Sequence, residues 1–88
     1  MFIATVNGRE HKVFFKHEKQ AGNHPTATTC FILDKETNEE VTRGVAKCNP
    51  ADRFEYEKGR KIALTRALQD ANATRSERGD VWAAYLAN

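Results

Sequence analysis

The first 48 residues alternate between apolar and polar side chains, which is the spacing of β-strands. The run Phe2–Val6 alternates in this way, and Asn7-Gly8 then supplies the positive φ angles of a tight hairpin turn. A second alternating run follows through Phe15. The chain therefore begins with a predicted β-hairpin.

Two further strands are predicted after a polar connecting loop over Glu18–Pro25. The segment Thr26–Leu33 is rich in β-branched and aromatic residues, which favours a third strand. Asp34–Glu40 is a polar turn, and Val41–Cys48 makes a fourth strand in which Gly44 marks a bulge or a point of close approach. The first half of the chain is thus predicted to be a four-stranded antiparallel meander.

The pattern becomes helical after residue 48. Asn49 can cap a helix and Pro50 fits its first position. Gly59 weakens the middle of this segment, so we expect a short first turn over 50–54 or a bend, and then a firmer helix through Ala71.

A last helix is predicted to begin after Thr74 and to run to Leu86. Thr74 and Glu77 have the spacing of a capping box, in which each side chain accepts a hydrogen bond from the other residue's backbone N–H. The packing side of this helix is expected to carry Val81, Trp82, Tyr85 and Leu86.

These elements predict one α+β domain over residues 1–88, with an antiparallel sheet over 1–48 and two or three C-terminal helices packed on it over 49–88. A chain of 88 residues has a thin hydrophobic core. Self-association is a natural way to bury more apolar surface, so we expect a homo-oligomer, a dimer or a larger assembly.

The charge balance argues against a protein whose main task is to bind duplex nucleic acid. Fourteen Lys and Arg residues face twelve Asp and Glu residues, for a net charge of +2. The chain has no run long and apolar enough to span a bilayer and no basic leader, so neither membrane insertion nor export is expected and the cytoplasm is the predicted location.

The chain shows no motif for catalysis or for a cofactor. Cys30 and Cys48 lie far apart and are expected to be buried thiols, with a cross-strand disulfide as the alternative. His11, His17 and His24 have no metal-ligand spacing. There is no Gly-x-Ser-x-Gly turn and no glycine-rich phosphate loop. We therefore expect a binding protein, not an enzyme.

Arg60 is the most informative charged residue. At about 100° per residue it falls on the same helix face as Ala63, Leu64, Ala67 and Leu68. A guanidinium on an apolar face needs a negative partner, since burying it alone is costly. That partner is either a structural ion pair at the rim of the core or an anionic ligand.

Other cations near Arg60 in sequence define a wider candidate site. Arg43, Lys47 and Arg66 lie in or near the fourth strand and the main helix, and Phe54 is interleaved with them. Arginine binds phosphate with forked donors, and an aromatic ring can stack on a base. The alternatives are that Phe54 packs in the core and that the charged residues form a solvated face.

A separate apolar residue, Ile62, is expected to be exposed beside Arg66. It is either part of a protein interface or a scattered surface residue.

Two segments carry a family resemblance. Gly44–Phe54, with the sequence GVAKCNPADRF, and Gly59–Leu68, with the sequence GRKIALTRAL, look like a pattern found in small bacteriophage proteins. Among these the chain is most similar to the phage Thoeris anti-defence sponges, which are oligomers that sequester cyclic nucleotide immune signals without cleaving them. The resemblance implies that Phe54 stacks on a base and that Arg60 and Arg66 bind phosphate.

The leading hypothesis is thus a phage-encoded anti-defence protein in the host cytoplasm. It would sequester a small anionic, cyclic nucleotide in a pocket between protomers. An alternative is an anti-defence protein that inhibits a host enzyme by direct contact through Ile62, Trp82 or Tyr85. A third is a single-stranded nucleic-acid module, against which the modest net charge counts.

Overall fold

A computed structural model of the chain describes residues 1–6, 8–19, 25–47 and 55–87. These residues form four strands and two helices: β1 Phe2–Val6, β2 Arg9–Lys19, β3 Pro25–Asp34, β4 Glu40–Lys47, α1 Tyr56–Asp70 and α2 Arg75–Ala87. The predicted α+β class is therefore confirmed, with two helices in the described part of the chain. The expected cap at Asn49 and Pro50 lies outside the described residues.

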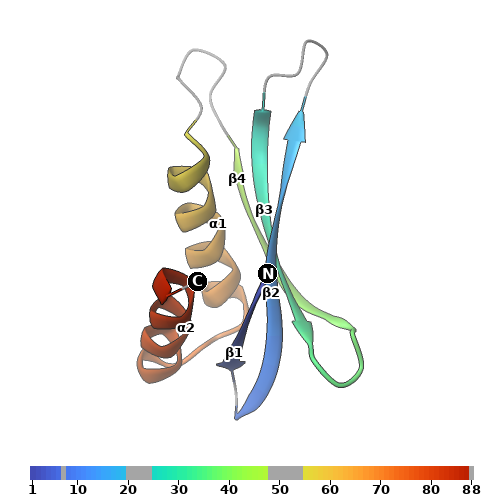
Figure 1. The fold of residues 1–88 in the computed structure, drawn as a ribbon, viewed down its shortest axis with the longest axis vertical. Helices are drawn as coiled ribbons and strands as arrows, with labels where there is room; N and C mark the ends of the chain where they lie inside the picture. Colours follow the sequence, from blue (N-terminus) through green and yellow to red (C-terminus); the bar gives the residue numbers. More distant parts are fainter. Residues whose placement is uncertain (7, 20–24, 48–54, 88) are drawn as a thin grey trace.

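The four strands form one antiparallel sheet in the order β1-β2-β3-β4, which confirms the predicted meander (Figure 1). In the first hairpin Val6 pairs with Arg9, and Gly8 has a φ of 75°. That angle lies in the left-handed region, which glycine enters without strain. The hairpin therefore forms where the sequence predicts it.

The loop predicted over Glu18–Pro25 is too long. β2 continues to Lys19 and β3 begins at Pro25, with Glu18 paired to Ala27. Pro25 is the first residue of its strand, a position where the missing N–H is tolerated. The polar composition of this segment concealed the strand ends, because strand residues that do not face the core can be charged.

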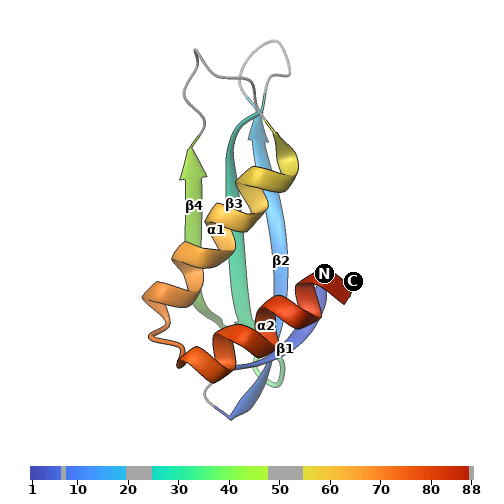
Figure 2. The same ribbon diagram turned by 90° about the vertical axis from the view of Figure 1, so that its left-hand side faces the viewer.

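Both helices lie on one face of the sheet, and the described chain leaves the other face uncovered (Figures 1 and 2). α1 packs on β3 and β4, and α2 packs on β1. The buried apolar side chains between the two layers provide most of the driving force for folding. They are Phe2, Ala4, Val6, Val13, Cys30, Ile32, Ala46, Ala63, Leu64, Ala67, Leu68, Ala73 and Val81.

α1 approaches the sheet very closely at Gly44. A Cβ added to Gly44 would lie 2.2 Å from the carbonyl oxygen of Ala63 and 2.3 Å from the backbone nitrogen of Ala67. No side chain fits in that space, so α1 rests directly on the backbone of β4. The prediction that Gly44 marks a close approach is confirmed.

The end of α1 and the start of α2 are both stabilised by local hydrogen bonds. At the end of α1, Asn72 has a φ of 55°, and the N–H of Ala73 donates to the carbonyl of Leu68 over 3.2 Å. This left-handed residue and its hydrogen bond close the helix with a Schellman turn. In the predicted capping box, the N–H of Thr74 donates to Glu77 Oε1 over 2.9 Å, and the N–H of Glu77 donates to Thr74 Oγ1 over 3.2 Å.

One expectation for the helices needs correction. Leu86 was expected on the packing side of α2 but is 71% exposed, because the last turn of the helix extends past the apolar cluster. Gly59 lies inside α1, and the short first turn that was one expectation over 50–54 lies outside the described residues. Among the described residues, no helix has the length and apolar content to cross a membrane.

Candidate functional site

Arg60 lies in the first half of α1, on the side of the helix that faces the sheet. Ala63 and Leu64, one turn later, are fully buried, whereas Arg60 is half-buried. This is the placement that helical spacing predicts. The side chain therefore lies at the rim of the core, where its methylene groups pack and its charged end reaches solvent.

A cavity of about 380 Å³ opens beside Arg60. It lies where β1 begins, and its lining comes from β1, β2 and both helices. The lining residues are Met1, Phe2, Phe15, Glu57, Arg60, Tyr85 and Leu86. The volume falls in the range of roughly 300–1,000 Å³ that is usual for small-molecule sites.

Tyr85 holds the aromatic part of this lining together. Its ring makes edge contacts with Phe2, Phe15 and Trp82, at centroid distances of 6.0, 5.8 and 5.7 Å. Such edge-to-face contacts fix the orientation of each ring against its neighbours. The cavity therefore has a rigid aromatic side.

The charged side chains of the lining are Arg60 and Glu57. The guanidinium of Arg60 makes no ion pair or hydrogen bond with any other residue that the structure describes. Glu57, the carboxylate in the lining, pairs with Lys61 one turn later, with an Nζ to Oε1 distance of 3.2 Å. The structural ion pair considered for Arg60 is thus not found among the described residues, and the forked donors of Arg60 are available to an anion.

The structure does not bring the other predicted site residues to this cavity. Arg43 lies on the opposite face of the sheet and binds Glu40 through two hydrogen bonds of 2.7 and 3.1 Å. Lys47 is exposed on the same face as Arg43. The expectation of one basic cluster between the fourth strand and the main helix is therefore wrong for these two residues, because side chains alternate along β4 and Gly44 takes the helix-facing position.

Arg66 and Phe54 also fall outside the cavity. Arg66 lies two turns after Arg60 on α1, and its Nη1 donates to the carbonyl of Val45 over 2.6 Å. Its guanidinium therefore helps to tie α1 to β4. Phe54 lies outside the described residues.

Apart from Arg60, the residues that line the cavity were not predicted to bind a ligand. Phe15 shares the helix-facing side of β2 with Val13, and Tyr85 was expected as a packing residue of the last helix and as an anchor for contact with a host enzyme. They meet Arg60 because three separate elements converge. A single sequence has no periodic signal for such a long-range contact.

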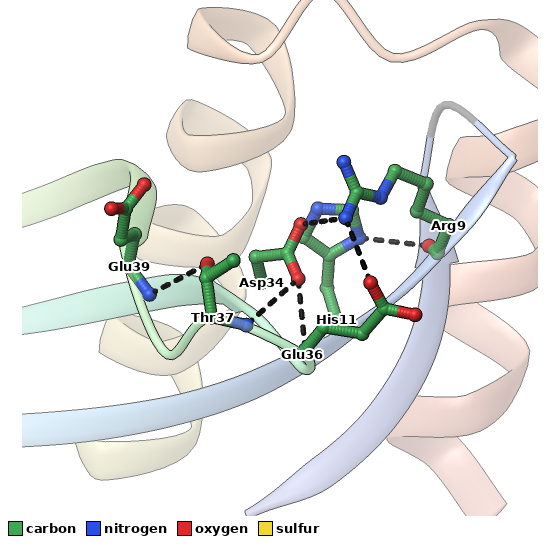
Figure 3. Close-up of polar contacts among 6 residues, drawn as sticks. All are labelled: Arg9, His11, Asp34, Glu36, Thr37 and Glu39. Carbon is green, nitrogen blue, oxygen red and sulfur yellow. Dashed lines mark hydrogen bonds and ion pairs between the residues drawn. The ribbon is translucent and has the colours of Figure 1, made fainter.

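A second polar cluster, at the end of β3, is structural (Figure 3). Asp34 pairs with Arg9 over 3.0 Å and accepts hydrogen bonds from the N–H groups of Glu36 and Thr37. The hydrogen bond from the N–H of Glu36 contributes most to lowering the pKa of the Asp34 carboxyl. The hydrogen bond from Thr37 and the nearby charge of Arg9 lower this pKa further. The Nδ1 atom of His11 lies 2.8 Å from the carbonyl oxygen of Arg9. The cluster therefore closes the turn between β3 and β4.

The remaining chemically reactive groups that the structure describes do not form a site. Cys30 is a free and fully buried thiol, which agrees with the expectation of a buried thiol at this position. Burial raises the pKa of this thiol to about 12. A thiol with so high a pKa is a poor nucleophile. Within the described ranges, no three His, Cys, Asp or Glu residues are grouped so that they could hold a metal ion.

The cavity beside Arg60 is therefore the best candidate for a binding site. It offers a cation that has no partner among the described residues, an aromatic side and a volume suited to a small molecule. Comparison of the chain with protein-family models, with curated proteins and with solved structures finds no match. The function must therefore be inferred from these residues.

Proposed function

We propose that this protein binds a small anionic nucleotide in the cavity beside Arg60 and holds it without cleaving it. The observation that supports this most directly is the guanidinium of Arg60, which lacks a partner among the described residues and lines an aromatic cavity. A forked guanidinium binds phosphate through two parallel hydrogen bonds. The rings of Phe15 and Tyr85 offer apolar surface to a base or a ribose.

The proposed role is sequestration of a cyclic nucleotide immune signal by a phage protein in the host cytoplasm. The resemblance of the Gly44–Phe54 and Gly59–Leu68 segments to phage anti-defence sponges supports this role. A protein that acts in this way needs affinity and no turnover. The absence of a catalytic motif from the sequence is in line with that requirement.

We further propose that a second protomer completes the cavity. Met1 and Leu86 lie at its lining and are 75% and 71% exposed. Apolar side chains that are this exposed beside a cavity are suited to burial against another subunit. A homo-oligomer would close the cavity and exclude water from the ion pair, which strengthens the electrostatic attraction.

The first test is calorimetric titration of a panel of cyclic nucleotides into the native protein and into Arg60→Gln. Loss of a charge-assisted hydrogen bond costs about 1.5–3 kcal/mol, so Arg60→Gln should weaken binding about ten- to a hundredfold. Arg78→Gln is the matched control, because Arg78 is exposed on α2 and does not line the cavity. Failure of the panel to bind, or equal loss in both variants, would contradict the proposal.

The second test asks whether the ligand survives. A nucleotide that binds should be recovered unchanged, as measured by chromatography after the complex is denatured. Recovery of a hydrolysed product would show turnover, which contradicts sequestration.

One observation favours the alternative function, inhibition of a host defence enzyme by direct contact. Ile62 is 37% exposed and lies among Lys61, Thr65 and Arg66 on the outer side of α1. The other two proposed anchors, Trp82 and Tyr85, are half-buried in the aromatic cluster and less available. Under this alternative, Ile62→Asp abolishes capture of a host protein from lysate and leaves nucleotide binding unchanged.

A further inference from the structure

The face of the sheet that the helices leave uncovered carries a second set of aromatic and basic side chains. We call it the open face. Strand alternation and the pairing register place on this face Lys12, Phe14 and Lys16 of β2, Phe31 of β3, and Arg43 and Lys47 of β4, together with the apolar Ile3, Leu33 and Val45. Phe14 and Phe31 are directly paired across β2 and β3, and Phe31 is directly paired with Arg43 across β3 and β4.

Three of these side chains form a stack that runs across the strands. The rings of Phe14 and Phe31 are stacked, with centroids 5.0 Å apart and planes inclined by 19°. The guanidinium carbon of Arg43 lies 5.1 Å from the centroid of Phe31. Because Phe14 and Arg43 approach from opposite neighbouring strands, the ring of Phe31 lies between them. Arg43 is held in this position by its two hydrogen bonds to Glu40.

The stack ends at Phe14, whose other side is open. β1 pairs with β2 only as far as Phe2 and Val13, so the residues next to Phe14 on that side are Met1 and Ile3, which are 75% and 41% exposed. Within the described chain, Phe31 is the one aromatic partner of Phe14. A planar group can therefore extend the stack on the free side of Phe14.

Cations lie next to this free side. Lys12 and Lys16 are two residues before and after Phe14 on the same face of β2. Lys12 donates to the side chain of Asn38 over 2.9 Å, and Lys16 has no ion pair or hydrogen bond with any residue of the described ranges. The carboxylates of this face are placed differently: Glu40 is bound to Arg43, Glu10 is bound to Lys35 over 2.8 Å, and Glu18 is at the far end of β2. The surroundings of Phe14 are therefore positive.

We propose that the open face binds single-stranded nucleic acid, with one base stacked on Phe14 and adjacent phosphates bound by Lys12 and Lys16. Base stacking on aromatic residues combined with cations that follow the backbone is the general chemistry of single-strand binding. A duplex does not fit, because its bases are already stacked on one another. A second copy of this sheet fits poorly, because the contact would bury lysines, which are depleted at the centres of protein interfaces.

The proposed surface and the cavity beside Arg60 lie on opposite faces of the sheet, and Met1 borders both. Phe14 faces away from the helices, and Phe15, its neighbour in sequence, faces them and lines the cavity. A substitution in one site should therefore leave the other unaffected. This separation allows the two proposals to succeed or fail independently.

The test is fluorescence anisotropy with a labelled single strand of about ten nucleotides, a length within the range that single-strand modules cover. Phe14→Ala should weaken binding at least tenfold, and Phe14→Tyr, which keeps the ring, should retain it. Circular dichroism of each variant shows whether the fold is intact. Phe14→Leu keeps apolar bulk without a ring, so a folded Phe14→Leu protein that binds like the native one would overturn the stacking role.

Salt dependence and the Arg60→Gln variant complete the test. Affinity should fall as salt rises, and Lys16→Ala should reduce the slope of log affinity against log salt by about 0.7, the value for one phosphate contact on a single strand. Arg60→Gln should leave the affinity for the strand unchanged. Equal binding of a duplex, absence of binding to the strand, or loss of binding in Arg60→Gln would each overturn the proposal.

Discussion

The two faces of the sheet are built from the same four strands but from different kinds of side chain. On the covered face most strand residues are buried, with Phe2 and Phe15 packed among smaller and aliphatic side chains, and α1 touches the backbone itself at Gly44. On the open face two phenylalanines lie among lysines and an arginine. Packing against the helices limits the size and polarity of the side chains on the covered face. The rings and cations of the open face have no helix to pack against in the described structure.

The largest expected difference between the two faces is in thiol reactivity. In a Cys48→Ser background, Cys30 on the covered face should react with a thiol reagent at pH 8 about a thousandfold more slowly than a cysteine placed on the open face by Lys16→Cys. The reason is that burial raises the pKa of Cys30 to about 12, which leaves little thiolate. The change in absorbance as the reagent reacts gives the modification rate of each cysteine. Comparable rates would show that the covered face opens readily in the native state.

The next largest effect is expected at Gly44. Gly44→Ala places a methyl group against the backbone of α1, so the helix must shift, and the free energy of unfolding should fall by about 3 kcal/mol. Gly79→Ala is the matched control. Nothing lies within 4 Å of the added carbon there, and alanine favours a helix, so stability should rise by about 0.5–1 kcal/mol. Denaturant unfolding measures the free energy of unfolding of both variants. A Gly44→Ala variant as stable as the native protein would contradict the close contact.

A smaller loss is expected at the start of α2, which covers β1. Thr74→Ala removes the acceptor for the N–H of Glu77 and should lower the free energy of unfolding by about 1 kcal/mol. Ser76→Ala, an exposed change in the same turn, should alter it by less than about 0.5 kcal/mol. If thermal or denaturant unfolding finds the two variants equally stable, the capping box does not hold this helix in place.

The smallest effect is a pH dependence at the edge of the covered face. The pKa of Asp34 is lower in the folded protein than its usual value of 3.8, so its ionised form stabilises the fold above that pH. This contribution is lost as the pH falls through the folded pKa. The difference in melting temperature between the native protein and Asp34→Asn should therefore shrink below about pH 4. A difference that stays constant down to pH 2 would exclude a role for the charge.

Local patterns predicted most of the fold. The alternation in Phe2–Val6, the glycine of the first hairpin and the Thr74 and Glu77 spacing each depend on neighbours within a few residues, so one sequence is enough to detect them. The ends of β2 and β3 were missed because Glu18 and Lys19 are polar, and polarity alone does not separate an exposed strand from a loop. The Schellman turn at Asn72 was missed because asparagine is a weaker sign of a left-handed residue than glycine.

The candidate site was less predictable than the fold. Arg60 was found because helical spacing places it on an apolar face. Its aromatic neighbours, Phe15 and Tyr85, come from distant segments, and their meeting depends on how the layers pack. Arg43 was grouped with Arg60 because the two are near in sequence, but strand alternation places Arg43 on the face opposite to that of Gly44.

The contact of α2 with β1 also sets an order of events during synthesis. β1 leaves the ribosome before the other described elements, and α2 leaves it after all of them. Phe2 and Val6 therefore have an open apolar surface until translation has passed the last helix. The sheet can pair earlier, because its neighbouring strands are adjacent in sequence, but the nascent protein remains exposed to aggregation and to chaperones until that final packing step.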